Sequence, residues 1–382
     1  MGLKVARRGL VPPFIVMEVM RAANARQAAG GDVLHLEVGQ PSTAAPRKVI
    51  EAAQAALAAD VIGYTEALGI PILRDRIARH YRESYGVNVD PARIVVTTGS
   101  SGAFLLSFLA AFDVGDRVAL AEPGYPAYRN ILSAIGAEPV PVPAGPATRF
   151  QPASELLDKI DGKLHGLIVA SPANPTGTML SRAELADLAG YCARRDMRLV
   201  SDEIYHGITY GQEATTALTV TAQAIVINSF SKYFSMTGWR LGWMVLPEDL
   251  MRSVECLSQN LFISPPTLSQ HAAVAAFESR DELDGNVARY ARNRAILLEE
   301  LPRAGLVDLA PADGAFYVYA NVSRFTNDSE AFCKRMLSEI GVAATPGIDF
   351  DHARGRASMR FSFAGSTDDM VEASRRIRGW LS

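Results

Sequence analysis

Apolar residues in the first part of the chain recur at helical spacing, interrupted by one strand-like segment. The apolar positions from Phe14 to Ala29 repeat every three or four residues, which predicts a helix. The segment from Asp32 to Val38 is typical of a short strand, and it leads into Gly39-Gln40-Pro41. Two further helices are expected, one over residues 46–59 and one over residues 72–85.

From residue 94 onwards, short apolar strands alternate with helices. The first strand, over residues 94–98, is rich in β-branched residues and is followed by a helix over residues 103–112. A second helix is predicted over residues 182–194, and the other strands are expected at residues 117–121, 166–170, 198–201 and 224–228. This alternation favours an α/β fold with a mainly parallel sheet covered by helices on both faces.

The last third of the chain has a different pattern. A long helix is expected over residues 267–301, followed by strands near 315–320 and 358–362 and a helix over 329–340. This order indicates a smaller α+β unit, which the N-terminal segment helps to complete.

Composition excludes several classes of function. The 382 residues include 38 Lys and Arg against 41 Asp and Glu, and this near-neutral balance disfavours nucleic-acid binding. The three cysteines, Cys192, Cys256 and Cys333, are far apart, so neither a disulfide framework nor a CxxC metal site is expected. The histidines form no zinc-type spacing, and prolines interrupt the apolar stretch near the N-terminus. We therefore expect a cytoplasmic protein without a metal, a signal peptide or a membrane span.

Polar side chains follow three of the predicted strands. Gly99-Ser100-Ser101-Gly102 stands between a strand and a helix, where it suits either a phosphate at the helix N-terminus or an ordinary helix cap. The loop of residues 171–177 holds Asn174 between two prolines, and Asp202 and Tyr205 follow the next strand. Ligands of open α/β sheets gather at such strand ends, although capping and packing explain each residue taken singly.

Lysine is scarce in this chain, and only one lysine has a setting suited to amine chemistry. Lys4, Lys48, Lys159, Lys163 and Lys334 have the surroundings of solvated charges. Lys232 instead follows an apolar strand, among hydroxyls, aromatics and glycines, and lies eight positions before Arg240. An apolar pocket lowers the pKa of an amine and so makes it nucleophilic.

The ordered set of these residues resembles the class I/II aminotransferases, which have fold type I and use pyridoxal 5'-phosphate (PLP). The resemblance extends from Leu36-Glu-Val-Gly-Gln-Pro41 to Met359-Arg360-Phe-Ser-Phe-Ala364. It implies a mainly parallel sheet of the seven-stranded type, sandwiched by helices, and a smaller α+β domain. Residues 1–45 would then contribute to the small domain and the substrate pocket, 46–285 would form the large PLP-binding domain, and 286–382 would complete the small domain.

The resemblance also implies a role for each matched residue. Lys232 would form the internal Schiff base with PLP and then move a proton between Cα of the substrate and C4' of the cofactor. Asp202 would pair with the pyridine nitrogen, and Asn174 and Tyr205 would bind the phenolic oxygen. Tyr125 would stack on the ring.

Phosphate and carboxylate binding are implied for the remaining residues. Arg360 would bind the substrate α-carboxylate with two parallel hydrogen bonds, and Gly39 would add a backbone contact. Tyr64 would reach the phosphate of a neighbouring subunit, which implies a homodimer with shared active sites. The other expected phosphate ligands are Ser100, Ser101, Ser229, Ser231 and Arg240.

Residues around the predicted substrate pocket bear on substrate specificity. The segment of residues 13–17 is apolar, and Ser101 stands where some aspartate-using relatives carry lysine. Both features favour a neutral or apolar amino acid as donor, although Arg129 and Arg21 are cations that can still enter the pocket. The partners are therefore an α-amino acid and a 2-oxo acid. Two alternatives remain, a PLP-dependent carbon-sulfur β-lyase and a non-catalytic PLP-binding regulatory module.

Overall fold

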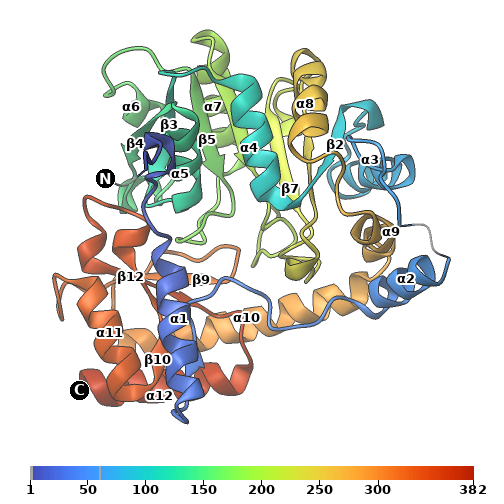
Figure 1. Cartoon of the computed structure of the whole chain (residues 1–382). Coiled ribbons are helices and arrows are strands. Elements are labelled where there is room, and N and C mark those ends of the chain that lie inside the picture. Colours follow the sequence, from blue (N-terminus) through green and yellow to red (C-terminus); the bar gives the residue numbers. More distant parts are fainter. Residues whose placement is uncertain (1–2, 60–61) are drawn as a thin grey trace.

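A seven-stranded sheet forms the centre of the larger part of the molecule (Figure 1). The computed structural model describes residues 3–59 and 62–382. The strand order is β2-β8-β7-β6-β5-β3-β4, and only β8 runs antiparallel to its neighbours. The strands are β2 (Ile94–Thr97), β3 (Arg117–Glu122), β4 (Glu138–Pro143), β5 (Gly166–Ala170), β6 (Arg198–Asp202), β7 (Ile225–Ser229) and β8 (Gly242–Val245).

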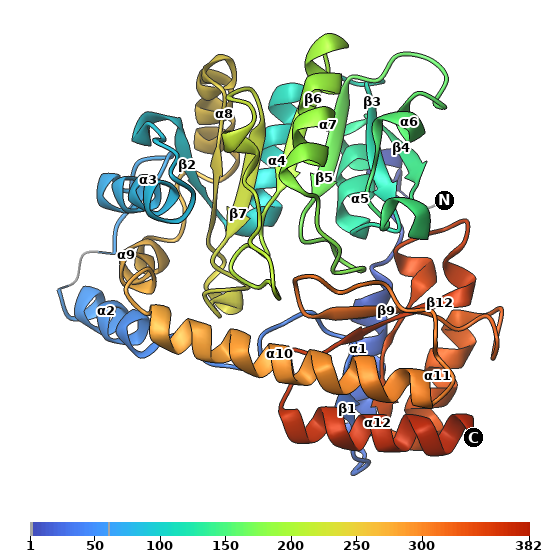
Figure 2. The same cartoon turned by 180° about the vertical axis from the view of Figure 1, so that it is seen from behind.

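Helices cover both faces of this sheet because its side chains alternate between two apolar clusters. Val95 and Val200 pack with α4, α5 and α8 on one face, and Val96 and Leu199 pack with α3, α7 and α9 on the other (Figures 1 and 2). The helices are α3 (Pro71–Tyr85), α4 (Gly99–Ala111), α5 (Pro126–Ile135), α6 (Ser154–Leu157), α7 (Arg182–Arg194), α8 (Glu248–Leu261) and α9 (Thr267–Ala276).

A smaller unit combines the two ends of the chain. Strand β1 (Leu34–His35) pairs with β10 (Val342–Ala343), and β12 (Ser358–Ser362) lies between β11 (Thr345–Pro346) and β9 (Tyr317–Asn321). Helices α1 (Ile15–Ala28), α11 (Ser329–Ile340) and α12 (Thr367–Leu381) surround these strands (Figure 1). The pairing of β1 with β10 joins the N-terminal segment to this unit, while the exact domain boundaries stay a prediction.

The helix expected over residues 267–301 is wrong as a single element. It is divided into α9 and α10 (Arg280–Arg303), and α10 runs from the sheet domain to the smaller unit, with α2 (Arg47–Ala58) near its first turns (Figure 2). Phe277, Glu278 and Ser279 separate the two helices. Neither proline nor glycine lies at this break, so the sequence carried no strong signal for it.

Two strands of the sheet were not predicted from the sequence. Strand β4 contains three prolines, at positions 139, 141 and 143, which the sheet accommodates because β4 is an edge strand paired only with β3. Strand β8 has only four residues and directly follows the loop that carries Arg240. Both strands lie where turn residues obscure the apolar pattern.

Other sequence expectations concern absences, on which the structure bears only within the described residues. No helix in this part of the chain is long and apolar enough to span a bilayer. Over residues 3–59 and 62–382, no three His, Cys, Asp or Glu side chains gather as a metal site. Cys192, Cys256 and Cys333 are unpaired. The cytoplasmic location stays a prediction.

Candidate active site

Three parallel strands end at the same edge of the sheet, and a predicted site residue lies at or just after the end of each. Asn174 lies in the loop after β5, Asp202 is the last residue of β6, and Lys232 lies just after β7. Parallel order therefore gathers side chains that are up to 58 positions apart in the sequence.

Lys232 is partly buried and lies against the N-terminal segment. Its Nζ donates a 2.7 Å hydrogen bond to the carbonyl of Gly39. Withdrawal from water lowers the pKa of Lys232 to about 8, and the positive charges of Arg360 and Arg240 act in the same direction. The negative charge of Asp202 opposes this shift. The amine is thus closer to its nucleophilic, neutral form than a surface lysine.

Asp202 is a buried carboxylate held by two donors. The hydroxyl of Tyr128 donates to Oδ2, and the backbone N–H of Ile204 donates to Oδ1 at 3.1 Å. Burial raises the pKa of Asp202 to about 6, whereas the two donors and the charge of Lys232 lower it. Sequence reasoning missed Tyr128, which lies on the inner face of α5 with the spacing of an ordinary core residue.

Arg360 lies on β12 with its guanidinium buried between two aromatic rings. Its Cζ is 4.4 Å from the centre of the Tyr317 ring and 4.8 Å from that of Phe350. Nη1 donates to Oδ1 of Asn174 at 2.8 Å, and Nη2 donates to the carbonyl of Glu37. The buried Nε atom has no hydrogen-bond partner among the described residues. The structure thus brings Arg360 directly against Asn174.

Tyr205 lies beneath the amine of Lys232 and forms a hydroxyl pair with a tyrosine of the smaller unit. Nζ of Lys232 is 5.8 Å from the centre of the Tyr205 ring. The hydroxyls of Tyr205 and Tyr317 are 2.6 Å apart. Sequence reasoning also missed Tyr317, although the expected strand over residues 315–320 includes it.

The start of α4 forms a cradle with Arg240. Gly99 has φ +75°, and a Cβ placed there would lie 2.5 Å from Nη2 of Arg240. A Cβ on Gly242 would lie 2.9 Å from the backbone nitrogen of Ser100. The glycines therefore let a guanidinium, a strand and a helix N-terminus approach closely, which is the arrangement that binds anions. The expected helix over residues 103–112 begins earlier than predicted, so Ser100 and Ser101 lie in its first turn.

Two other predicted phosphate ligands lie beside this cradle. Ser229 Oγ and Ser231 Oγ are buried and lie 3.0 Å apart at the end of β7. Tyr64 instead projects into solvent, with a relative exposure of 84%. Among the residues that the structure describes, the Tyr64 side chain has no hydrogen bond to the other predicted site residues.

Phe14, in the apolar segment of residues 13–17, contacts Tyr125. The rings of Phe14 and Tyr125 meet edge to face with centroids 5.7 Å apart. The two cations considered from the sequence have other partners: Arg129 Nη2 donates to the carbonyl of Asp349 at 2.5 Å, and Arg21 pairs with Glu18 at 3.1 Å. Arg21 is largely exposed.

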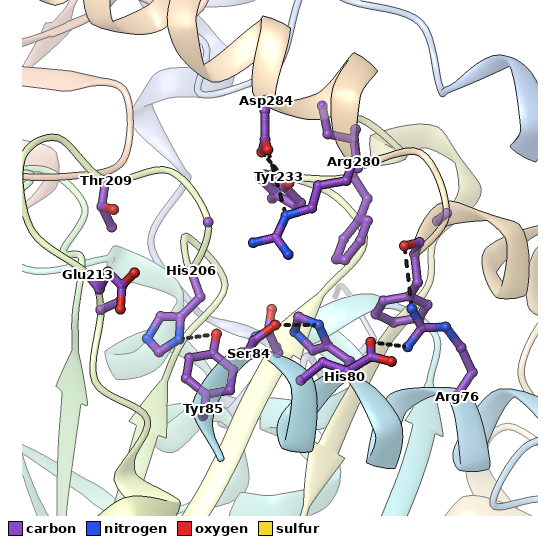
Figure 3. A pocket seen from close by; sticks show the side chains of 18 residues that line it. Arg76, His80, Ser84, Tyr85, His206, Thr209, Glu213, Tyr233, Arg280 and Asp284 are labelled. Carbon is purple, nitrogen blue, oxygen red and sulfur yellow. Dashed lines mark hydrogen bonds and ion pairs between the residues drawn. The ribbon is translucent and has the colours of Figure 1, made fainter. Parts of the chain in front are cut away.

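A cavity of about 260 Å³ lies apart from these residues, between α3, the start of α10 and the loop after Tyr205 (Figure 3). Its wall includes His206, whose ring bonds to Tyr85 at 2.9 Å. Burial lowers the pKa of His206 to about 3, so the ring is neutral. Adjacent residues of one segment thus face different spaces, Tyr205 toward Lys232 and His206 toward this cavity.

Comparison with known proteins agrees with this arrangement. The family model for aminotransferase class I and II matches residues 31–377. A valine–pyruvate aminotransferase of Mycobacterium tuberculosis is 56% identical, over 99% of this chain and 98% of its own length.

Solved structures give the same result. The crystal structure of an aminotransferase from Mycobacterium tuberculosis has a TM-score of 0.98 at 56% identity, over 100% of this chain and 99% of that one. Aspartate aminotransferase from Thermus thermophilus with maleate has a TM-score of 0.94 at 32% identity, over 99% and 100%. The fold-type-I prediction is therefore confirmed. The chain belongs to the aminotransferase class I and II family and is an enzyme that moves an amino group from an amino acid to a 2-oxo acid.

Proposed function

We propose that this enzyme carries PLP covalently on Nζ of Lys232 and accepts the amino group of a neutral, aliphatic amino acid. The observation that carries the proposal is the position of this amine, 2.7 Å from the Gly39 carbonyl and in the field of Asp202 and Arg360. With a pKa of about 8, an appreciable fraction of Lys232 is neutral near pH 7, and the neutral amine is the form that attacks an aldehyde.

The surrounding donors and acceptors fit each part of PLP. The cradle of α4 and Arg240 suits a phosphate, because helix N–H groups and a guanidinium both favour an anion. Asp202 offers a buried carboxylate for a protonated ring nitrogen. In this proposal, Asn174 and Tyr205 bind the phenolic oxygen, and Tyr125 covers the ring face. The proposed phosphate ligands besides Arg240 are Ser100, Ser101, Ser229 and Ser231.

Two residues of this chain, Asp202 and Lys232, would hold or transfer the protons of the reaction. The chemistry that PLP supplies is an aldehyde for the amino group and a ring that accepts the electron pair left at Cα. Asp202 would hold a proton on the ring nitrogen and so keep the ring electron-poor. Nζ of Lys232, as a free amine, would be the base that takes the proton from Cα of the substrate and the acid that returns it.

Arg360 would orient the substrate through its α-carboxylate. A guanidinium offers two parallel N–H groups, which match the two oxygens of a carboxylate. In the structure these groups bond to Asn174 and the Glu37 carbonyl, and Nε has no partner. We infer that an incoming carboxylate takes over part of this bonding, with the Gly39 backbone beside it.

The apolar segment of residues 13–17 supports a neutral donor such as valine. Phe14 lies against Tyr125, and a side chain that enters there meets aromatic carbon. Arg129 donates to the Asp349 carbonyl and Arg21 pairs with Glu18, so both cations have other partners in the structure. The relative that is 56% identical is named for valine and pyruvate, which supports the same substrate class here.

The proposed active unit is a homodimer in which Tyr64 reaches the phosphate of the partner subunit. The backbone on either side of Tyr64 is fixed: Thr267 donates to the Gly63 carbonyl at 2.5 Å, and Thr65 N–H lies 3.4 Å from Ser264 Oγ. The side chain is nevertheless 84% exposed. Other apolar side chains on the adjoining segments are exposed too, namely Ile62, Leu261 and Ile263. A second copy of the chain would cover them.

A single-turnover experiment tests the cofactor, the reaction and the substrate class. Protein saturated with PLP should show a visible absorption band that Lys232→Ala abolishes and Lys159→Ala, at an exposed position, retains. Valine alone should convert the band to that of pyridoxamine phosphate, and pyruvate should restore it. A strong response to aspartate with none to valine contradicts the proposed substrate. Release of pyruvate and ammonia from cystathionine without any 2-oxo acid selects the β-lyase instead.

A further inference from the structure

Tyr317 lies where three segments of the chain meet. It is the first residue of β9 and is 1% exposed. Its hydroxyl is 2.6 Å from that of Tyr205, and its ring lies 4.4 Å from Cζ of Arg360. A Cβ on Gly39 would lie 1.7 Å from the Tyr317 oxygen, so the backbone that accepts the Lys232 hydrogen bond rests directly on this hydroxyl.

The direction of the tyrosine pair follows from counting hydrogens. A phenol has one hydrogen to donate and an oxygen that accepts. In the proposed function, Tyr205 donates its hydrogen to the phenolic oxygen of the cofactor. Its own oxygen must then accept the hydrogen of Tyr317. Hydrogen bonds in a chain polarise each other, so a donor at Tyr317 makes Tyr205 a stronger donor.

The ring of Tyr317 has a separate effect on Arg360. Tyr317 and Phe350 hold the guanidinium from two sides, at 4.4 and 4.8 Å. An aromatic face attracts a cation, most strongly when both are buried, which helps to hold the Arg360 guanidinium in place in the apolar interior. The ring therefore fixes the plane in which Arg360 presents its N–H groups.

We propose that Tyr317 is a positioning residue that serves both halves of the site. Its hydroxyl strengthens the hydrogen bond from Tyr205 to the cofactor, and its ring orients Arg360 for the substrate carboxylate. The inference rests on the proposed function, because it takes the phenolic oxygen as the acceptor of Tyr205. It adds a residue of the smaller unit to a cofactor site built on the large sheet.

Tyr317→Phe tests the hydroxyl. The Tyr205 hydrogen bond favours the deprotonated form of the bound chromophore, in which the phenolic oxygen carries negative charge. A weaker bond leaves the protonated form in place up to a higher pH. The pH midpoint of the visible band should rise by about 0.5 to 1 unit, less than in Tyr205→Phe. Because the ring remains, KM for valine should stay within about twofold of the wild type.

Tyr317→Leu tests the ring. Loss of the aromatic face leaves Arg360 with one ring, so KM for the amino acid should rise by about 5- to 30-fold. The midpoint should shift as in Tyr317→Phe. This split between a spectroscopic effect of the hydroxyl and a KM effect of the ring is not expected from a general loss of stability.

Tyr319→Phe is the matched control. Tyr319 is on the same strand, is buried, and packs its ring against Phe150 and Phe350. Its hydroxyl removal should change neither the midpoint nor KM. The inference is overturned if Tyr317→Phe leaves the midpoint where Tyr319→Phe leaves it while Tyr205→Phe shifts it, or if Phe and Leu at 317 raise KM equally. A wild-type protein without a visible band would instead overturn the proposed function, and the inference with it.

Discussion

At the scale of single residues, the charge of Asp202 is decided by opposing effects. Burial favours the neutral acid and raises the pKa to about 6, while the Tyr128 hydroxyl and the Ile204 N–H favour the carboxylate. In the proposed function only the carboxylate pairs with the protonated ring nitrogen. The folded protein must therefore release this proton before PLP binds below pH 6.

The affinity for PLP should accordingly depend on pH, with a sign set by Asp202. Its folded-state pKa lies above the ordinary value of 3.8, so the carboxylate form is lost as the pH falls through about 6. We expect the affinity of the apoprotein to fall below this pH, approaching tenfold per unit. Tyr128→Phe removes a donor to the charged form, raises the pKa of Asp202 further and moves the fall to higher pH.

Titration of apoprotein with PLP between pH 5 and 8 measures this shift. Tyr191→Phe is a suitable control, because Tyr191 donates to the surface carboxylate of Asp158 at 3.0 Å, away from the proposed site. The control should follow the wild-type curve. Superimposable curves for Tyr128→Phe and wild type would refute the role assigned to Tyr128.

The contrast between found and missed residues has a physical reason. Asp202, Lys232 and Asn174 stand out in the sequence because they are polar and lie at or shortly after the ends of apolar strands, and the family resemblance gave them their predicted roles. Tyr128 and Tyr317 continue that pattern, because a buried tyrosine is mostly an apolar ring. The roles proposed for them depend on hydroxyl partners that are 74 and 112 positions away. Such pairs follow from tertiary packing, which the sequence pattern does not specify.

At the scale of elements, the junction of α4 with β8 depends on the absence of a side chain at Gly242. A Cβ there would lie 2.9 Å from the Asn228 carbonyl oxygen, the Gly99 carbonyl carbon and the Ser100 nitrogen. All three are backbone atoms of strand β7 and the α4 turn, and they cannot rotate away. The first turn of α4 would have to move away from Arg240.

Gly242→Ala should therefore weaken both the fold and the anion cradle. We expect a loss of about 1 to 3 kcal/mol in the free energy of unfolding and at least about a tenfold loss of PLP affinity. Gly238→Ala, a few residues earlier, is the control, since a Cβ there has nothing within 4 Å. Urea unfolding and PLP titration of both variants measure the effects. An unchanged PLP affinity in a destabilised Gly242→Ala protein would contradict the prediction that PLP binding depends on the close contact between α4 and β8.

Elements were predictable where the apolar pattern was uninterrupted. Strands β5 and β12 and helices α7 and α11 have the predicted bounds, because each has a clear pattern and, for α7, a capping box from Ser181 and Glu184. Strand β4 was hidden by its prolines, and the break between α9 and α10 lacked a helix-breaking residue. The alternation of strands and helices still predicted the layered α/β architecture, since it depends on the order of elements rather than on each boundary.

At the scale of the whole molecule, one predicted site residue is left unexplained by a single chain. Every other predicted cofactor residue lies at the carboxyl edge of the sheet, at the start of α4 or α5, or beside Arg240. Tyr64 lies apart from these residues and is 84% exposed, on a backbone that Thr267 and Ser264 hold in place. A fixed backbone with an exposed aromatic side chain is expected if a second subunit supplies the contact.

Mixing two variants, each with a different defect in the site, tests this contact directly. A Lys232→Ala subunit keeps Tyr64, and a Tyr64→Ala subunit keeps Lys232. If Tyr64 acts across the interface, a mixed dimer contains one site with both residues and one site with neither. Tyr64→Ala alone should bind PLP at least about tenfold more weakly than wild type, because a hydrogen bond to a charged group contributes about 1.5 to 3 kcal/mol.

Subunits mixed in equal amounts and exchanged by mild denaturation and refolding should then regain wild-type PLP affinity at about a quarter of all sites, because about half of the dimers are mixed and each of these has one complete site. Each refolded variant alone is the control and should show no recovery. Mixing Lys232→Ala with Lys232→Ala/Tyr64→Ala should also give none, since no subunit carries the amine. If Tyr64 acts within its own chain, the first mixture gains nothing, because no subunit then has both residues. No recovery in the first mixture, together with a monomeric mass of the wild-type protein by sedimentation, would exclude the shared site.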